Sequence, residues 1–239
     1  MIDALDVRKR FGALEVLRGV DLHVRRGRVT AIVGPNAAGK TTLIKAILGL
    51  TRLDAGQLTF DGERINGDCA YRARIGYMPQ IARFPENLTG RELLAMISDL
   101  RRWSTDADDE LVGEFSLAGE LDKPLRTLSG GTRQKLNSVL AFRFRPELLV
   151  LDEPTAGLDP VASSVLKDRI LAERGAGRTC IITSHVLGEL EELADDVVLL
   201  TDGRVSFSGT MTDLKSLTRQ STLERAIAEM MRRHAMAVA

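Results

Sequence analysis

The nine residues GPNAAGKTT, Gly34 to Thr42, constrain this chain more than any other stretch. They follow a short run of apolar and β-branched residues, 28–34, and precede 42–50, where apolar residues recur at helical spacing. A glycine, four further residues and Gly-Lys-Thr between a strand and a helix match the phosphate-loop template. Backbone N–H groups at the start of such a helix converge on an anion, so the segment predicts a nucleotide-binding site.

The side chains of this loop have distinct expected roles. Lys40 reaches the β and γ phosphates of a nucleotide as a point charge, and the Thr41 hydroxyl can ligate Mg²⁺. Ala37 stands where a tightly bent loop favours glycine; if its φ is positive, the strain costs about 1 kcal/mol relative to glycine. The loop residues expected to contact the nucleotide are Gly34, Pro35, Asn36, Ala37, Ala38, Gly39, Lys40, Thr41 and Thr42.

The composition is that of an ordinary soluble chain. Of 239 residues, 44% are hydrophobic and 28% charged, and 33 basic residues balance 33 acidic ones. A formal net charge of zero gives no basic field for a nucleic-acid backbone, so no nucleic-acid partner is expected. The apolar runs are far shorter than the roughly 20 residues of a membrane helix, and no targeting segment is recognisable. We expect a cytoplasmic protein that contacts a membrane only through a partner.

Apolar strands alternate with amphipathic segments. Segments 147–154 and 178–185 are nearly continuous in Val, Ile and Leu, as in parallel strands covered on both faces. Between them, 160–175 is typical of a crossover helix. Asp-Gly pairs at Asp61 and Asp202, each between alternating segments, predict antiparallel hairpins at the margins of the sheet.

The middle of the chain has helical patterning and no convincing strand, which predicts an inserted helical lobe. We therefore predict an α/β fold with a mixed-sheet core, an antiparallel β margin and one amphipathic helix at the C-terminus. All residues, 1–239, would form a single domain. Its predicted parts are the core with its β margin at 1–85 and 146–215, the helical lobe at 86–145 and the C-terminal helix at 216–239.

A pair of acidic residues ends the first of the two apolar strands. Asp152 closes the run, so its side chain should emerge at the carboxyl edge of a parallel sheet, where the phosphate loop also opens. This position predicts a Mg²⁺ ligand. Glu153 is better placed as the general base that polarises an attacking water, because Asp152 is occupied with the metal.

Further motifs give the chain a resemblance to a known family. LSGGTRQK at 128–135 lies shortly before ELLVLDEP at 147–154, and AGLDP at 156–160 and SH at 184–185 follow. With the phosphate loop, these five motifs cover nearly the whole chain. The chain resembles the nucleotide-binding subunit of an ATP-binding-cassette (ABC) transporter, which implies a phosphate-loop NTPase of the ABC type with a RecA-like core.

The resemblance implies roles for single residues. Phe11 matches the aromatic residue that stacks on adenine, and Gln80 the glutamine that touches the metal and the attacking water. His185 matches the histidine that hydrogen-bonds the γ-phosphate and helps to hold Glu153. Asp159 matches a loop that crosses a dimer interface. The catalytic set is thus Glu153, His185 and Gln80, and the metal set is Thr41, Gln80 and Asp152.

The resemblance also implies a dimer. Ser129, Gly130 and Gly131 match the family signature, which contacts the γ-phosphate bound on a second copy. The implied unit is a homodimer around two ATP molecules that hydrolyses ATP with Mg²⁺ and drives conformational change in separate transmembrane permease subunits at the inner face of the cell membrane. Thr132 stands where the family usually has Gln, and we expect function to survive, because the backbone donors remain.

A narrower resemblance concerns the subfamily. The compact chain resembles subunits that pair with ABC-2-type permeases. SGGTRQKLN and LERAIA are similar to the ATPases of copper-processing systems that serve nitrous oxide reductase maturation, which implies an exporter linked to copper-enzyme maturation. No copper site is expected in the chain itself, since its histidines and cysteines are scattered. We expect Cys69 and Cys180 to be buried or half-buried, and His23 and His234 to lie on the surface.

The alternative is a soluble ABC ATPase that acts on nucleic acid or the ribosome. A DNA-repair or chromosome-organising ATPase needs a long coiled-coil insertion, and the segment between Gln80 and Ser129 is too short for one. A ribosome-associated protein carries two cassettes and a basic linker, whereas this chain has one cassette and no net charge. A binding module without hydrolysis would lack Glu153 or His185, and both are present.

Overall fold

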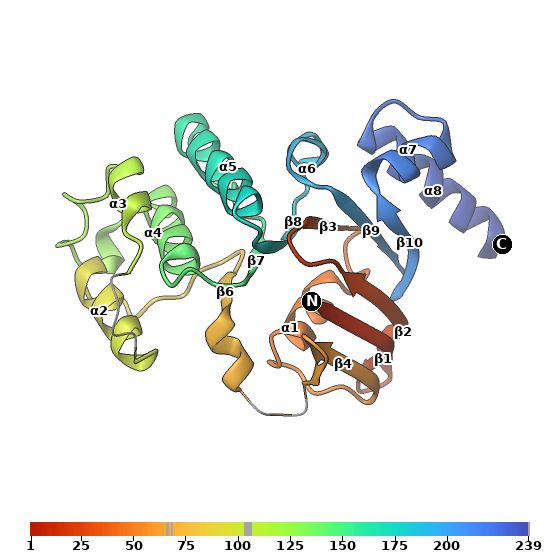
Figure 1. The fold of residues 1–239 in the computed structure, drawn as a ribbon, viewed down its shortest axis with the longest axis horizontal. Helices are drawn as coiled ribbons and strands as arrows, with labels where there is room; N and C mark the ends of the chain where they lie inside the picture. Colours follow the sequence, from red (N-terminus) through yellow and green to blue (C-terminus); the bar gives the residue numbers. More distant parts are fainter. Residues whose placement is uncertain (66, 68, 103–106, 239) are drawn as a thin grey trace.

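The computed structural model describes residues 1–65, 67, 69–102 and 107–238. The predicted helical lobe, 86–145, and the predicted C-terminal helix, 216–239, each include residues outside these ranges. Figure 1 shows a central sheet, a second sheet that contains the N-terminus, and a group of helices beyond the opposite edge of the central sheet. Among the described residues, no helix combines the length and the apolar character needed to cross a bilayer.

In the described part of the chain, the central sheet has six strands in the order β10-β9-β3-β8-β7-β6. β9 and β10 pair antiparallel, and the other neighbours pair parallel. The strands are β3 Val29–Val33, β6 Ile75–Met78, β7 Leu148–Asp152, β8 Thr179–Thr183, β9 Asp196–Thr201 and β10 Arg204–Thr210. All residues of β3, β7 and β8 are buried, which explains why their sequences are mostly apolar and β-branched. The predicted mixed sheet and the strands predicted at 28–34, 147–154 and 178–185 are confirmed.

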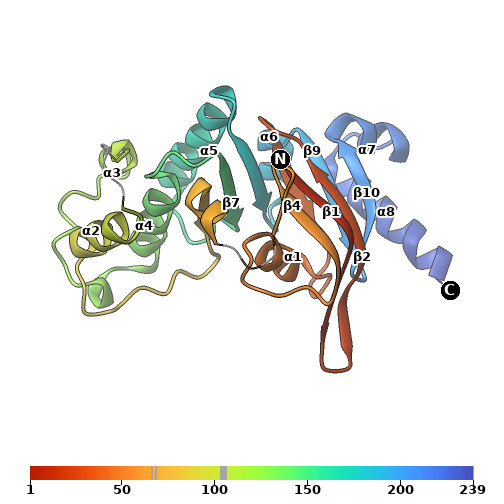
Figure 2. The ribbon, with the colours of Figure 1, turned by 60° about the horizontal axis from the view of Figure 1, so that its bottom comes forward.

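The second sheet is antiparallel and lies against α1, Lys40–Ile47 (Figure 2). Its strands, in the order β2-β1-β4-β5, are β1 Ile2–Phe11, β2 Leu14–Val24, β4 Ala55–Phe60 and β5 Glu63–Arg64. Leu58 and Phe60 of this sheet form one apolar cluster with Ile44 of α1 and Ile32 of β3. α1 is therefore packed between the two sheets.

One of the two predicted hairpins lies elsewhere than expected. The turn at Asp202 joins β9 to β10 at the edge of the central sheet, as predicted. The turn at Asp61 joins β4 to β5, which belong to the second sheet, so the prediction that this hairpin borders the parallel sheet is wrong. The reason is that β4 pairs with β1, with Phe60 opposite Ile2, and both side chains are buried on the α1 side of that sheet.

The other face of the central sheet is covered by α5, Pro160–Gly175, and α6, Leu187–Leu193. Leu166 and Ile170 of α5 pack in one apolar cluster with Leu149 and Leu151 of β7. α5 connects β7 to the parallel strand β8, so the predicted crossover helix at 160–175 is confirmed.

Helices of the middle segment stand beside the β6 edge of the central sheet (Figure 1). They are η1 Ala70–Arg74, which precedes β6, then α2 Gly90–Leu100, α3 Glu110–Glu114, η2 Leu125–Thr127 and α4 Gly130–Phe142. α2 begins with a capping box between Thr89 and Glu92. α4 runs so close to β6 that a Cβ on Gly76 would lie 2.0 Å from the carbonyl oxygen of Ala141.

The C-terminal segment forms two helices, α7 Met211–Thr218 and α8 Leu223–Val238. The predicted amphipathic helix is α8, but the prediction that one helix begins at residue 216 is wrong, because α7 ends at Thr218. Thr210 caps the start of α7 through Asp213. Arg219 then adopts a left-handed conformation with φ 55°, which ends α7 before the amphipathic run of α8 begins.

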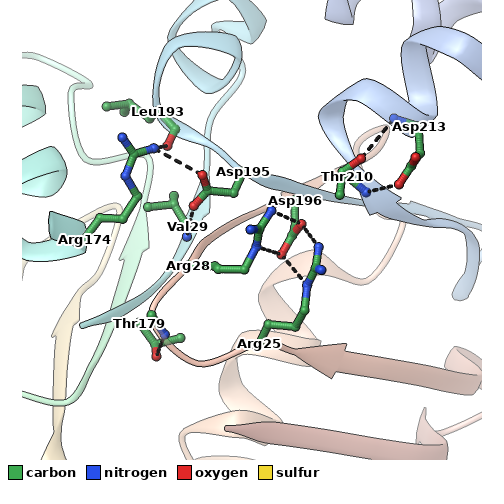
Figure 3. Close-up of polar contacts among 11 residues, drawn as sticks. Arg25, Arg28, Val29, Arg174, Thr179, Leu193, Asp195, Asp196, Thr210 and Asp213 are labelled. Carbon is green, nitrogen blue, oxygen red and sulfur yellow. Dashed lines mark hydrogen bonds and ion pairs between the residues drawn. The ribbon is translucent and has the colours of Figure 1, made fainter. Parts of the chain in front are cut away.

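Charged side chains tie the amino-terminal ends of β3 and β9 together (Figure 3). The buried carboxylate of Asp196 accepts hydrogen bonds from Arg25 and, at 2.8 and 2.9 Å, from Arg28. The neighbouring Asp195 accepts from the backbone N–H of Val29 at 2.9 Å. Burial alone raises the pKa of Asp196, but the hydrogen bonds from Arg28 and Arg25 outweigh it and hold this pKa below its ordinary value. The cluster fastens the end of the sheet that lies opposite the phosphate loop.

Candidate functional site

The phosphate loop joins the carboxyl end of β3 to α1 through a backbone with positive φ at three residues. Gly34 and Gly39 have φ values of 150° and 104°, and a Cβ on Gly34 would lie 2.1 Å from the carbonyl oxygen of Leu200. Ala37 also has a positive φ, 62°. Strain at Ala37 was expected if its φ is positive, and the structure meets this condition.

Lys40 lies at the start of α1 and is half-buried. Its ammonium donates to the carbonyl oxygens of Gly34 at 2.7 Å and Pro35 at 3.0 Å. Burial lowers the pKa of Lys40, although the carboxylates of Glu153 and Asp152 act to raise it. The loop thus holds a cation next to two carboxylates.

A cavity of about 530 Å³ opens over the loop and brings together most of the predicted site. It is lined by Leu14, Val16, Asn36, Ala37, Ala38, Gly39, Lys40, Thr41, Thr42, Gln80, Asp152, Glu153 and His185. The residues expected to hold Mg²⁺, namely Thr41, Gln80 and Asp152, therefore share one cavity. Their hydroxyl, amide and carboxylate oxygens fit a hard cation. Among the described residues, no three His, Cys, Asp or Glu side chains cluster as a metal site of their own.

The two acidic residues at the end of β7 are held by β8. The buried hydroxyl of Thr183 donates to Asp152 Oδ1 at 2.5 Å. The backbone N–H of Glu153 donates to the carbonyl oxygen of Thr183 at 3.1 Å, and its φ is 53°. Sequence analysis missed Thr183, because a β-branched residue at the end of a strand has no distinguishing pattern.

The carboxylate of Glu153 faces His185. Glu153 Oε2 accepts from the backbone N–H of His185 at 3.1 Å, and Glu153 Oε1 lies 3.4 Å from His185 Nε2. The Glu153 side chain is 10% exposed and the His185 side chain 60%. The contact holds a buried carboxylate at the edge of the cavity, within reach of a histidine that is open to solvent.

Helix α4 is tied to the same cavity by buried amides that sequence analysis also missed. Asn137 donates to the carbonyl oxygen of Pro79, next to Gln80, at 2.9 Å. Gln134 donates to the carbonyl oxygen of Pro154 at 3.2 Å. The loops that present Gln80 and Glu153 are thus fixed to one helix.

Ser129, Gly130 and Gly131 form the start of α4 and lie outside the lining of this cavity. Ser129 caps the helix by accepting from the backbone N–H of Thr132 at 3.1 Å. A Cβ on Gly131 would lie 3.1 Å from the carbonyl oxygen of Gly157, in the loop that leads to Asp159. This segment therefore lies beside the Asp159 loop of the same chain and outside the cavity over its own phosphate loop.

Asp159 caps α5 and also contacts α4. Its carboxylate accepts from the backbone N–H of Ala162 at 2.9 Å and forms an ion pair with Lys135 at 3.0 Å. The bond from Ala162, followed by that from Lys135, lowers the pKa of Asp159. The exposed loop before α5 is thereby fastened to the helix that begins with Gly130.

Comparisons with known proteins give the family. The profile described as ABC transporter matches residues 17–156, from β2 through the phosphate loop to the acidic pair after β7. This chain belongs to the ABC transporter family. The daunorubicin resistance ATP-binding protein DrrA3 of Streptomyces coeruleorubidus is 37% identical over 226 residues, covering 92% of this chain and 72% of that protein. The Nod factor export ATP-binding protein I of Burkholderia lata is 37% identical over 208 residues, covering 85% and 68%.

The fold of this cassette matches solved structures. A structure of an ATP binding subunit of an ABC transporter superposes with a TM-score of 0.91 at 30% identity, covering 97% of this chain and 99% of that one. The predicted ABC-type fold is confirmed, and so is the prediction that the cassette is an ATPase.

Phe11 lies outside the lining of the cassette's cavity. It ends β1 with 51% of its surface exposed, and Lys9 Nζ lies 5.2 Å from its ring centroid. Leu14 and Val16 of β2, which sequence analysis did not single out, line the cavity instead. The stacking role of Phe11 stays a prediction.

The cysteines and remaining histidines differ in part from expectation. Cys180 is buried in β8, and burial raises its pKa. Cys69 is exposed, so the prediction that it is buried or half-buried is wrong; it directly precedes η1, none of whose residues is buried. His23 is exposed and lies 2.5 Å from Asp3. His234 is half-buried against Asp202, so its prediction as a plain surface residue needs correction.

Proposed function

We propose that this chain is the ATP-hydrolysing subunit of an ABC exporter whose membrane path is formed by separate permease subunits. The observation that supports the proposal most is the convergence of Lys40, Asp152, Glu153 and His185 on one cavity over the phosphate loop. Phosphoryl transfer to water uses a lysine on the phosphate-binding loop, a carboxylate for the metal and a residue that orients the attacking water, and Lys40, Asp152 and Glu153 supply these parts.

In this proposal ATP lies with its phosphates over residues 34–42. Backbone N–H groups at the start of α1 face the phosphates, and the Lys40 ammonium exchanges the carbonyl oxygens of Gly34 and Pro35 for phosphate oxygens. Phe11 stacks on the adenine, and the adjacent apolar side chains of Leu14 and Val16 extend that contact.

Thr41, Gln80 and Asp152 would hold Mg²⁺, because their oxygens share the cavity and Thr183 engages one carboxylate oxygen of Asp152, Oδ1. The bound ion would neutralise charge on the phosphates. Glu153 takes a proton from the attacking water, since its carboxylate is buried at the cavity edge. His185 hydrogen-bonds the γ-phosphate while its backbone N–H keeps Glu153 in place.

The complete site needs a second copy of the chain. Ser129, Gly130 and Gly131 lie outside the cavity of their own chain, beside the exposed loop of Asp159. A helix start of this kind presents backbone N–H groups to an anion, so in a homodimer it closes on the ATP held by the other copy. Two copies then enclose two ATP molecules.

The transported molecule is recognised by the permease. The names of two relatives concern daunorubicin resistance and Nod factor export, which favours export of an organic molecule. The link to copper-enzyme maturation is the finer alternative, based on the resemblance of SGGTRQKLN and LERAIA. In either case the chain lies in the cytoplasm, at the inner face of the membrane, and contacts it through the permease.

Purification of the chain with its associated proteins from membranes tests this proposal. We expect a membrane protein of about six spanning helices to copurify, and ATP hydrolysis by the complex to rise when the exported molecule is added. Stoichiometric RNA or DNA in place of a membrane protein would contradict the transport proposal and favour the nucleic-acid or ribosome alternative.

A further inference from the structure

Helix α8 reaches the phosphate loop through a short chain of direct contacts. His234 Nε2 lies 3.2 Å from Asp202 Oδ2, in the turn between β9 and β10. A carboxylate at neutral pH only accepts, so the imidazole donates. The next residue of the turn, Gly203, donates its backbone N–H to the carbonyl oxygen of Ala38 at 3.2 Å. The C-terminal helix, the turn and the phosphate loop are thereby connected.

A second observation places α8 behind the catalytic segments. A cavity of about 180 Å³ has Ile227 and Met231 of α8 on one side and Gly34, Pro35 and His185 among the residues on the other. The carbonyl oxygens of Gly34 and Pro35 hold Lys40. α8 therefore forms one wall of this smaller cavity. Gly34, Pro35 and His185 would have to move toward α8 to leave the nucleotide site.

The start of α8 is anchored firmly enough to act on these segments. The backbone N–H of Leu223 donates to Glu191 Oε2 at 3.0 Å, and Glu191 pairs with Lys215 of α7 at 2.5 Å. Leu223 and Ala226 are fully buried. Because Glu191 belongs to α6, which begins two residues after His185, α8 is fixed to the element that follows the histidine.

We propose that α8 braces the nucleotide site, with His234 and Met231 as positioning residues. His234 holds the turn that supports Ala38. Met231 limits movement of Gly34, Pro35 and His185 away from the nucleotide cavity of about 530 Å³. The inference rests on the proposed function of this larger cavity. Neither residue touches ATP in this arrangement; both act through the loop, so their loss weakens ATP binding more than it weakens the fold.

Replacement of His234 tests the brace most simply, since the side chain lies near the C-terminus and is only half-buried. His234→Ala should weaken the affinity for a fluorescent ATP analogue and raise the KM for ATP, each by up to about fivefold, because a pair with one exposed partner, Asp202, contributes at most a small energy. His234→Gln keeps a donor and should recover most of the affinity. His23→Ala is the matched control: it removes another histidine paired with an aspartate, in the second sheet.

Met231→Ala provides an independent variant. It should lower kcat/KM by about tenfold, because a loosened loop misplaces Lys40 and His185. Met231→Leu should stay near wild type, and Met236→Ala, on the same helix at a position 78% exposed, should not change the values. The melting temperature is measured for every variant.

Unchanged affinity and KM in both His234→Ala and Met231→Ala would overturn the brace, even if Met231→Ala melts earlier. If Met231→Ala does not fold, His234→Ala decides alone. A wild-type chain that binds the analogue but hydrolyses no ATP would contradict the proposed function, whereas the binding measurements would still decide the brace.

Discussion

At the scale of single residues, the site was predictable where an ionisable side chain belongs to a short motif and the motifs follow one another in a fixed order. Lys40, Asp152, Glu153 and His185 were predicted from motifs, and the structure places all four around one cavity. Thr183 was not predicted, because its role depends on β8 lying beside β7, a neighbour that the sequence around it does not specify. Residues that act through tertiary neighbours leave no local pattern.

Ala37 gives the prediction at this scale. Ala37→Gly should raise the free energy of unfolding by up to about 1 kcal/mol and tighten ATP binding several-fold, because glycine adopts a φ of 62° without strain. Ala38→Gly is the control: its φ is not positive and its side chain is buried, so this change should lower stability. Urea unfolding and nucleotide titration check both variants. Unchanged affinity in Ala37→Gly would mean that the loop accepts alanine without cost to binding.

At the scale of elements, the buried parallel strands were predictable, whereas in the second sheet only the hairpin at Asp61 was predicted and not its pairing with β1. β7 and β8 are buried throughout and apolar except at their ends, and such runs have few alternatives. β1 and β2 mix charged and apolar residues and pair through several register shifts, so no strict alternation marks them. The connection between α4 and the loop of Gln80 was invisible for a related reason, since Asn137 looks like any polar residue of a helix.

Asn137 gives the prediction at this scale. Asn137→Ala removes the hydrogen bond to Pro79 and should reduce the ATPase rate by about tenfold, because Gln80 loses its fixed position. ATP affinity should stay nearly constant, since the phosphate loop is untouched. Asn87→Ala is the control, because Asn87 is an exposed asparagine that precedes α2 in the same helical part of the chain. The measurements are steady-state hydrolysis and ATP titration, and a normal rate in Asn137→Ala would contradict the role given to the α4 contact.

At the scale of the whole molecule, the two ends of the central sheet have different tasks. The carboxyl ends of its parallel strands face the nucleotide cavity, whereas Asp196 and its two arginines fasten the opposite ends (Figure 3). The motifs predict a dimer only through the family resemblance that they carry, and the dimer stays a prediction. Which surfaces remain free for it was not predictable, because that depends on how α4 and the Asp159 loop pack together.

Asp196 gives a stability prediction. Asp196→Asn should lower the free energy of unfolding at neutral pH by about 2 kcal/mol, a moderate loss because both arginines are partly exposed. The folded pKa of Asp196 lies below its ordinary value of 3.8, so the wild-type advantage is present above 3.8 and is lost as pH falls through the folded pKa. Urea unfolding at several pH values measures the difference in the free energy of unfolding between wild type and Asp196→Asn. A difference that is as large in strong acid as at neutral pH would contradict the account. Asp99→Asn, at an exposed site, is the control.

The central claim is that two copies complete each ATP site. Glu153→Gln should bind ATP, turn over extremely slowly and therefore accumulate as a closed dimer, because the polarising carboxylate is lost while the loop is intact. Light scattering with ATP should then report a molar mass of about twice the 26.2 kDa of one chain. A double variant that carries both Glu153→Gln and Ser129→Arg should stay monomeric with ATP bound. A Glu153→Gln chain that binds ATP and stays at 26.2 kDa, or a dimer that forms equally well with Ser129→Arg, would contradict the composite site.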